Sequence, residues 1–318
     1  MNEHTEHAGH VEHAGHTEHT EHTGHAGHTG HTEHTEHAGP AGHVEHAGPA
    51  GRAGRAGRAG RAGGAAGGVA PAGHPARAWL PFGEPPVSRP RLFCFPSAGS
   101  SAAAFAPWRA LVPAGVTVCP VQPPGRAERF RERPYDRCAP LVEDLVSALR
   151  EQFSGTYALY GHSLGALVVF ELARRLRRLG ARPPAHLFVS GRAAPQLPDV
   201  RRPLRDLPPD ELIGAVADIG GTPADVLRDK DLMTSLLPLL RADFSVNETY
   251  EYRGESPLGV PLTVFGGQRD PRADRAELLA WEDLTTERFQ LRVFPGGHFF
   301  IHDQAKELLT MMVLPLAG

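Results

Sequence analysis

The segment Gly161-His162-Ser163-Leu164-Gly165 constrains the fold more than any other stretch, because it places a serine between two glycines where one kind of element gives way to another. Residues 157–160 form a short apolar run typical of a strand, and residues 164–179 repeat apolar side chains at helical spacing. A turn this sharp holds its central residue in a strained backbone conformation, and glycines two positions away let strand and helix approach without Cβ clashes. The pattern therefore predicts a strand, a tight turn with Ser163 at its apex, and a helix.

The first 75 residues have a different composition from the rest. They consist largely of three-residue units such as His-Thr-Glu and His-Ala-Gly, followed by Gly-Arg-Ala units, and they contain all but four of the 19 histidines. Large apolar side chains are almost absent there, so burial cannot offset the entropy lost on ordering. We expect residues 1–75 to be a disordered, low-complexity tail.

A histidine-rich tail also raises the possibility of metal binding, because neutral imidazole is a common ligand of zinc, nickel and copper. The repeat, however, has no fixed acidic or cysteine partners and defines no single coordination geometry. The sequence therefore predicts no metal site and no cofactor. A non-catalytic metal-binding or scaffold protein organised by the tail is kept as an alternative.

Residues 76–318 are long enough for one sizeable α/β domain. The chain has 33 basic and 36 acidic side chains, and without the tail's four arginines and eight glutamates the remainder is near neutral, so no nucleic-acid partner is expected. An apolar stretch long enough to span a membrane is absent from the sequence. Three cysteines without metal spacing indicate reduced thiols. We expect a cytoplasmic monomer without a membrane anchor.

Short apolar runs alternate with helical patterns along this domain, which indicates a mostly parallel sheet with helices on both faces. The expected strands are 91–95, 116–121, 157–160, 186–190, 261–265 and 289–294, and the expected helices include 138–152 and 164–179. Ligands of such sheets bind beyond the carboxyl ends of the strands. The residues discussed next all follow a predicted strand.

Ser163, Asp270 and His298 follow three of these strands, in the chain order of an α/β-hydrolase. A serine hydroxyl becomes a useful nucleophile when an imidazole removes its proton, and a carboxylate on the far ring nitrogen orients that imidazole. We predict an α/β-hydrolase fold with Ser163, His298 and Asp270 as the catalytic residues. Asp274 is the nearby competitor for the place of Asp270.

Acyl transfer also requires N–H donors aimed at the developing oxyanion. The first expected donor is the backbone N–H of Leu164, directly after the serine. The second should come from the loop after the strand 91–95, where Pro96 has no N–H to donate. Ser97 and Ala98 are the candidates, and Ala98 is favoured.

The motifs of the domain resemble those of a type II thioesterase, the free-standing α/β-hydrolase associated with polyketide and nonribosomal peptide synthases. The resemblance covers about residues 88–312, and its motifs are Cys94-Phe95-Pro96-Ser97-Ala98-Gly99, Val121-Gln122-Pro123-Pro124-Gly125-Arg126, Gly161-His162-Ser163-Leu164-Gly165-Ala166, Gly220-Gly221-Thr222-Pro223, Leu240-Arg241-Ala242-Asp243-Phe244, Glu248-Thr249-Tyr250 and Phe294-Pro295-Gly296-Gly297-His298-Phe299-Phe300. Ser97 and Ser100 depart from the residues usual in that family. No counterpart of the tail is expected in the family.

This resemblance implies hydrolysis of acyl groups from the phosphopantetheine thiol of an acyl or peptidyl carrier protein. It also implies that the long insertion between two strands, about residues 195–256, is a helical lid over the serine, with helical patterns at 209–217 and 230–240. Two arginine-rich stretches, in 174–182 and 201–205, could meet an acidic carrier or could simply be solvated. A chain-releasing or cyclising acyltransferase or esterase of the same fold is the alternative activity.

Overall fold

The computed structural model describes residues 75–316 of the protein. Apart from Pro75, which begins a short helix, the tail expected over residues 1–75 lies outside the described residues. The description below concerns residues 75–316 only.

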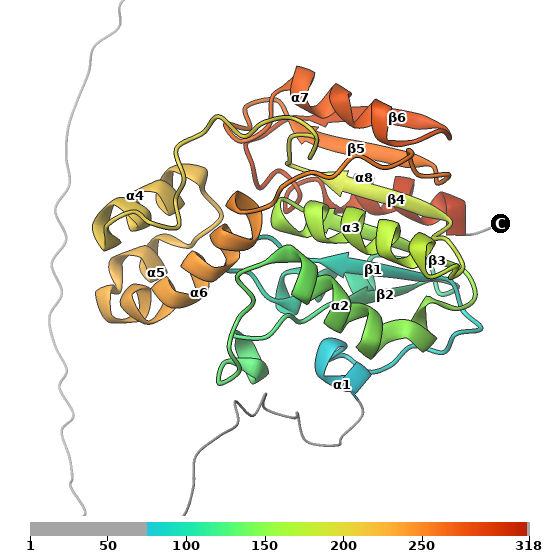
Figure 1. Ribbon diagram of the computed structural model, residues 1–318. Helices are drawn as coiled ribbons and strands as arrows, with labels where there is room; N and C mark the ends of the chain where they lie inside the picture. The colour runs from blue at the N-terminus through green and yellow to red at the C-terminus, as the bar shows by residue number, and fades with distance from the viewer. Residues whose placement is uncertain (1–74, 317–318) are drawn as a thin grey trace, which may run out of the picture. The chain divides into compact units, whose positions relative to one another are not determined.

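A six-stranded sheet in which every pair of neighbours is parallel forms the centre of the fold (Figure 1). Its spatial order is β2-β1-β3-β4-β5-β6, so the two edges are β2 and β6. The sequence therefore predicted the α/β fold class correctly. The strands are β1 (Arg91–Phe95), β2 (Thr117–Pro120), β3 (Tyr157–His162), β4 (His186–Ser190), β5 (Leu262–Gly267) and β6 (Phe289–Phe294).

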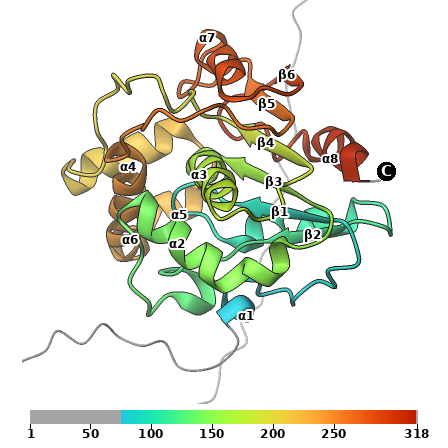
Figure 2. The same ribbon diagram turned by 45° about the vertical axis from the view of Figure 1, so that its right-hand side comes forward.

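Helices cover both faces of the sheet (Figure 2). Side chains alternate along the strands between two apolar clusters. In β1, Phe93 packs into the cluster that contains α2 and α3, whereas Leu92 packs into the cluster that contains α8. Because both faces are covered, every residue of β1 and β3 is buried, as expected for a central parallel strand. The helices outside the insertion are α1 (Pro75–Trp79), α2 (Cys138–Leu149), α3 (Leu164–Arg178), α7 (Arg275–Leu279) and α8 (Ala305–Val313).

The segment between β4 and β5 leaves the sheet and forms three helices with an apolar cluster of their own (Figure 1). They are α4 (Pro209–Ile219), α5 (Ala224–Arg228) and α6 (Lys230–Glu248). Leu212 of α4 and Met233 of α6 are among the most buried residues of this cluster. Helix α6 runs eight residues past the end expected from the sequence, and it contains Pro238 in its interior. We call residues 191–261 the helical insertion.

Candidate active site

The turn at Ser163 has the strained backbone that the sequence predicted. Ser163 has φ 54° and ψ −112°, in the positive-φ region that residues with a Cβ rarely adopt. It lies between β3 and α3, and its N–H donates to the carbonyl oxygen of Ser190 at 2.8 Å, which ties the turn to the end of β4. The serine therefore stands at the carboxyl edge of the sheet, where α/β proteins bind their ligands.

Two glycines allow the backbone segments around this turn to approach each other. A Cβ on Gly161 would lie 2.1 Å from the carbonyl oxygen of Gly165, and a Cβ on Gly165 would lie 2.2 Å from the carbonyl oxygen of Phe95. Both distances are far inside van der Waals contact, and the atoms met are backbone atoms that cannot turn aside. The second glycine therefore packs α3 directly against the loop that follows β1.

Asp270 and His298 meet at the carboxyl ends of β5 and β6. The Nδ1 atom of His298 lies 2.9 and 3.0 Å from the two carboxylate oxygens of Asp270, and the side chains of these residues are 3% and 0% exposed. Asp270 also accepts a hydrogen bond from the backbone N–H of Arg272 at 2.8 Å. A carboxylate on Nδ1 leaves Nε2 as the ring nitrogen that can face a substrate or a serine.

Asp274, the competing carboxylate, has a different partner. Its side chain accepts from the backbone N–H of Glu277, and the Glu277 carboxylate accepts from the backbone N–H of Asp274, which makes a capping box at the start of α7. Asp274 is therefore a helix cap, and Asp270 is the carboxylate that reaches the imidazole.

Ser163 and His298 line one cavity of about 630 Å³. Among the described residues no direct hydrogen bond joins the serine hydroxyl to the imidazole, although catalytic hydrogen bonds are often long until substrate binds. Helices α4 and α6 supply much of the cavity's apolar wall, including Val216, Ile219, Met233, Leu236, Leu240 and Phe244. A cavity with these walls suits an apolar acyl chain that ends at the serine.

The candidate oxyanion donors lie on the same cavity. Leu164, Ser97 and Ala98 all line it, and within residues 75–316 none of their backbone N–H groups donates to another protein group. The Ser97 residue is buried and Ala98 is partly exposed. The geometry thus offers Leu164 with either neighbour, and the preference for Ala98 stays a prediction.

His162, beside the serine, is buried and does not line the cavity. Its Nδ1 atom lies 2.8 Å from the hydroxyl of Ser190, which is also 2.9 Å from the hydroxyl of Tyr160. Burial, with the nearby imidazoles of His298 and His302, holds the pKa of His162 well below its usual value. His162 is therefore a neutral packing residue under the turn.

Sequence reasoning missed two features of the site, one in the cavity wall and one behind it. Arg192 lines it and donates to the side chain of Asn247, and burial lowers the pKa of this arginine to about 10. Asp243 of α6 accepts a hydrogen bond from the backbone N–H of Gly99, in the loop that carries the candidate oxyanion donors. A signal for Asp243 was present, because it lies in one of the motifs quoted above, but its partner could not be read from the sequence.

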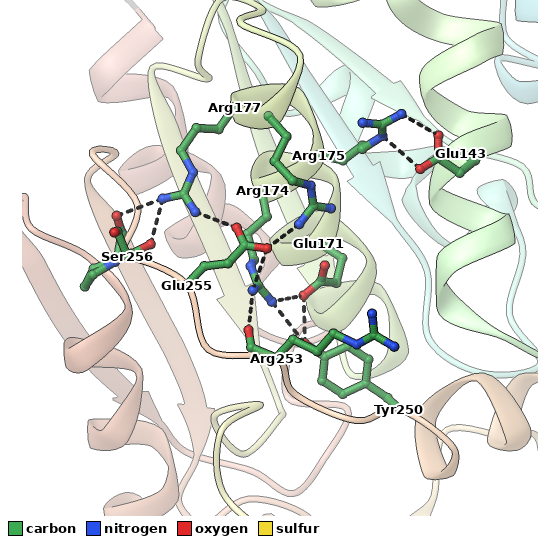
Figure 3. Close-up of polar contacts among 11 residues, drawn as sticks. Glu143, Glu171, Arg174, Arg175, Arg177, Tyr250, Arg253, Glu255 and Ser256 are labelled. Carbon is green, nitrogen blue, oxygen red and sulfur yellow. Dashed lines mark hydrogen bonds and ion pairs between the residues drawn. The ribbon is translucent and has the colours of Figure 1, made fainter.

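The arginines at the end of α3 are paired with carboxylates rather than free (Figure 3). Arg174 and Arg177 converge on Glu255, at 3.0 and 2.8 Å, and Arg175 lies 2.8 Å from Glu143 of α2. The hydroxyl of Tyr250 donates to Glu171 of α3 at 2.7 Å. The contacts of Glu255 and Tyr250 fasten the chain that leaves α6 to α3, whereas the Arg175–Glu143 pair joins α3 to α2.

The arginines of the insertion are also paired. Arg201 lies 2.5 Å from Glu277, and Arg202 lies 2.9 Å from Glu211. Much of the positive charge of both stretches is thus compensated locally, which favours the solvated interpretation over a docking patch.

Three further properties concern residues 75–316. No group of His, Cys, Asp and Glu side chains there is arranged to hold a metal ion. No helix in this range is both long and apolar enough to span a membrane. Cys94, Cys119 and Cys138 are buried free thiols, and burial raises the pKa of Cys119 and Cys138 to about 12. The cytoplasmic location and the monomeric state stay predictions.

Comparison with known proteins identifies the family. A model of the thioesterase domain matches residues 90–313. The chain belongs to the thioesterase family. It is similar to the gramicidin S biosynthesis protein GrsT of Aneurinibacillus migulanus, with 40% identity over 222 residues, 70% of this chain and 87% of the relative.

Solved structures of thioesterases resemble the enzyme as well. RedJ, a thioesterase from the prodiginine biosynthetic pathway of Streptomyces coelicolor, is 40% identical with a TM-score of 0.66, and the match covers 71% of this chain and 86% of RedJ. BorB, a type II thioesterase from the borrelidin biosynthetic cluster, is 34% identical with a TM-score of 0.67, over 72% of this chain and 93% of BorB. The thioesterase resemblance read from the sequence is therefore confirmed, and the enzyme is a hydrolase of thioesters.

Proposed function

We propose that this thioesterase hydrolyses acyl groups from the phosphopantetheine arm of acyl or peptidyl carrier proteins, in an editing role for a polyketide or nonribosomal peptide synthase. The observation that carries the proposal is the Asp270–His298 pair, whose imidazole lines the same cavity as the strained Ser163. Relatives named for gramicidin S, prodiginine and borrelidin biosynthesis support the pathway type.

In the acylation step, the Ser163 hydroxyl oxygen attacks the thioester carbonyl carbon while Nε2 of His298 takes the hydroxyl proton. Asp270, on Nδ1, holds the imidazole in the required tautomer and stabilises its protonated form. The carbonyl oxygen becomes an oxyanion facing the N–H groups of Leu164 and Ala98, a contribution typically worth about 3–4 kcal/mol per donor to the barrier. The carbon–sulfur bond then breaks, and the pantetheine thiol leaves with the proton from His298.

Deacylation repeats the same steps with water as the nucleophile. His298 takes a proton from water, whose oxygen attacks the acyl carbon of the ester on Ser163. When the carbon–oxygen bond to Ser163 breaks, the proton returns to the serine and a free acid is released. In the earlier acylation step the leaving group is a thiol, which leaves readily, so that step requires no general acid besides His298.

The helical insertion would act as the lid in this mechanism. Its helices α4 and α6 supply apolar residues to the cavity wall, which would shield the acyl-enzyme from bulk water and shape the space for the acyl chain. The carrier arm would have to reach Ser163 past these helices.

One assay tests nucleophile, reaction and substrate together. Wild-type enzyme and Ser163→Ala are incubated with acetyl-carrier and long-chain acyl-carrier proteins, and free acid and free carrier thiol are measured by mass spectrometry. We expect the wild type to release both products and the variant to release neither above background. Equal release by both proteins would overturn the role of Ser163, and a cyclic or transferred product would favour the alternative chain-releasing activity.

A further inference from the structure

Two charged residues from motifs that the proposed chemistry does not use form a buried ion pair. Arg126 belongs to the segment after β2, and Asp243 belongs to α6 of the helical insertion, 117 residues later. Nη1 and Nη2 of Arg126 each lie 2.8 Å from one carboxylate oxygen of Asp243, a bidentate arrangement. The side chains are only 6% and 4% exposed.

The pair also holds the loop that follows β1. Oδ2 of Asp243 accepts the backbone N–H of Gly99 at 2.7 Å, and Nη1 of Arg126 donates to the carbonyl oxygen of Ser100 at 3.0 Å. Gly99 and Ser100 are the two residues that directly follow Ala98. The loop with the candidate oxyanion donors is therefore fastened on its C-terminal side through one N–H and one carbonyl.

Each side-chain nitrogen of Arg126 and each carboxylate oxygen of Asp243 has a hydrogen-bond partner. The Nε atom of Arg126 donates to the carbonyl oxygen of Pro124 at 3.2 Å, so the guanidinium is held from both ends. Gly99 adopts φ +72°, and a Cβ there would lie 2.7 Å from the side chain of Leu240 of α6. Helix α6 thus packs directly on the loop, and the ion pair contacts the loop beside this packing.

Stability alone does not account for this arrangement. A buried ion pair seldom stabilises a fold more than two apolar side chains of similar volume would. Apolar side chains could hold α6 in place, but they could not accept the N–H of Gly99. The carboxylate therefore does something that packing cannot: it fixes the orientation of a peptide unit next to Ala98.

We propose that Arg126 and Asp243 are positioning residues that orient the loop 97–100, so that the Ala98 N–H points at the oxyanion. The proposal rests on the proposed acyl-transfer function of Ser163. On this proposal α6 contributes to catalysis, because the Asp243 carboxylate on this helix holds the loop that carries the Ala98 N–H. Loss of the pair would lower the rate of forming the tetrahedral intermediate and leave substrate affinity nearly unchanged.

The test uses a paired apolar variant to distinguish two roles of the ion pair: orienting the loop 97–100, or only holding α6 in place. In Arg126→Met with Asp243→Leu, the charges are replaced together, so no unpaired buried charge remains. Asp243→Asn keeps the size of the side chain and removes its charge, and Arg126→Lys keeps a positive charge and loses the bidentate contact. The control is Arg175→Gln with Glu143→Gln, which removes a partly exposed pair between α2 and α3.

Each variant is measured by urea unfolding, by kcat and KM on a small acyl thioester, and by the rate at which a fluorophosphonate labels Ser163. We expect the paired apolar variant to unfold near the wild-type urea concentration, with kcat and labelling rate lowered roughly 100-fold, the effect of losing one oxyanion donor, and KM within about threefold of wild type. Asp243→Asn and Arg126→Lys should lie between this variant and wild type. The control should match wild type in all three measurements.

Wild-type kcat and labelling rate in the folded paired variant would show that the pair only fastens α6, and would overturn the proposal. If that variant does not fold, the same two rates in Asp243→Asn and Arg126→Lys decide the outcome. Labelling of Ser163 does not depend on the natural acyl group. An enzyme that labels normally but releases no acid from carriers would contradict the proposed substrate and leave the positioning test intact.

Discussion

The two halves of the proposed oxyanion site are held in different ways. The turn at Ser163 and Leu164 is held by backbone: two glycines permit its close contacts, and the Ser163 N–H donates to Ser190 in the next strand. The loop at Ala98 is held by side chains from elsewhere in the chain, chiefly the Arg126–Asp243 pair.

Because of this difference, we expect the two halves to respond differently to a movement of the helical insertion. The turn is held by contacts with Phe95 of β1 and Ser190 of β4, so it should be rigid whatever the insertion does. The loop depends on α6, so any movement of that helix would be transmitted to the oxyanion site through Asp243. If the proposal holds, a movement of α6 would change both the access of the acyl chain and the oxyanion contacts of the loop, and would leave the turn unchanged.

The largest effect is expected from a substitution that disrupts the close contact between the two halves, at Gly165 and Phe95. In Gly165→Ala, the new Cβ would lie 2.2 Å from the carbonyl oxygen of Phe95, so α3 and the β1 loop would be forced apart. We expect loss of soluble, folded enzyme or of all measurable activity, checked by circular dichroism and turnover.

Gly214→Ala is the matched control for this change. Gly214 lies in α4 with nothing within 4 Å of an added Cβ, so the variant should be as stable as wild type or up to about 1 kcal/mol more stable. A Gly165→Ala protein with wild-type melting temperature and kcat would contradict the importance of the close approach.

The next largest effect concerns the imidazole that serves both halves. Asp270→Asn should lower kcat by roughly 10⁴-fold, because an amide on Nδ1 favours the wrong tautomer of His298. Asp274→Ala should leave kcat unchanged and lower the free energy of unfolding by about 1 kcal/mol, because it removes the cap of α7. Steady-state kinetics and urea unfolding of both variants check this, and a kinetic defect only in Asp274→Ala would reverse the assignment.

A smaller effect is expected in the pH dependence of stability, because the imidazole of His162 is buried beneath the turn. Burial holds the pKa of His162 well below its usual value, so below about pH 6.5 the unfolded chain binds a proton that the folded protein does not. Stability should therefore fall as pH falls from about 6.5, by up to about 1.4 kcal/mol per pH unit from this group. His162→Asn should reduce that slope in urea unfolding between pH 7.5 and 5.5, and an unchanged slope would show that the ring is accessible to protons.

The smallest effect is expected at the exposed pair Arg202–Glu211, whose side chains are 70% and 49% exposed. A double-mutant cycle with alanine at both positions should give a coupling free energy of about 0–1 kcal/mol, because water screens the pair. A larger coupling would mean that exposure is a poor guide to the strength of ion pairs in this protein, and would weaken the contrast with Arg126–Asp243.

The expected strands match the structure to within one or two residues, because apolar runs bounded by turn residues are a local signal. β1, β4 and β6 have the expected bounds, whereas β3 and β5 each continue two residues further. The added residues are Gly161, His162, Gly266 and Gly267, which continue the backbone pairing of β3 with β4 and of β5 with β6. Composition gave no sign that pairing would continue there.

The helices of the insertion were less predictable for a related reason. Helix α6 continues from its expected end at residue 240 to Glu248, through Asp243 and Asn247. Each of these polar residues meets a partner from another segment: the buried Asp243 meets Arg126, and the half-buried Asn247 meets Arg192. A helix predicted from the spacing of apolar residues ends too early when the next positions that contact a neighbouring segment are polar.

By itself, the sequence determined the parallel α/β sheet, the strained turn at Ser163 and the chain order of Ser163, Asp270 and His298, because each depends on local pattern or on the rule that ligands bind at strand ends. Only the tertiary structure decided that Asp270 rather than Asp274 reaches His298, and that Asp243 holds the loop beside Ala98. The physical reason is that a hydrogen bond depends on where two groups lie in space, and residues 28 or 144 positions apart meet only after the chain has folded.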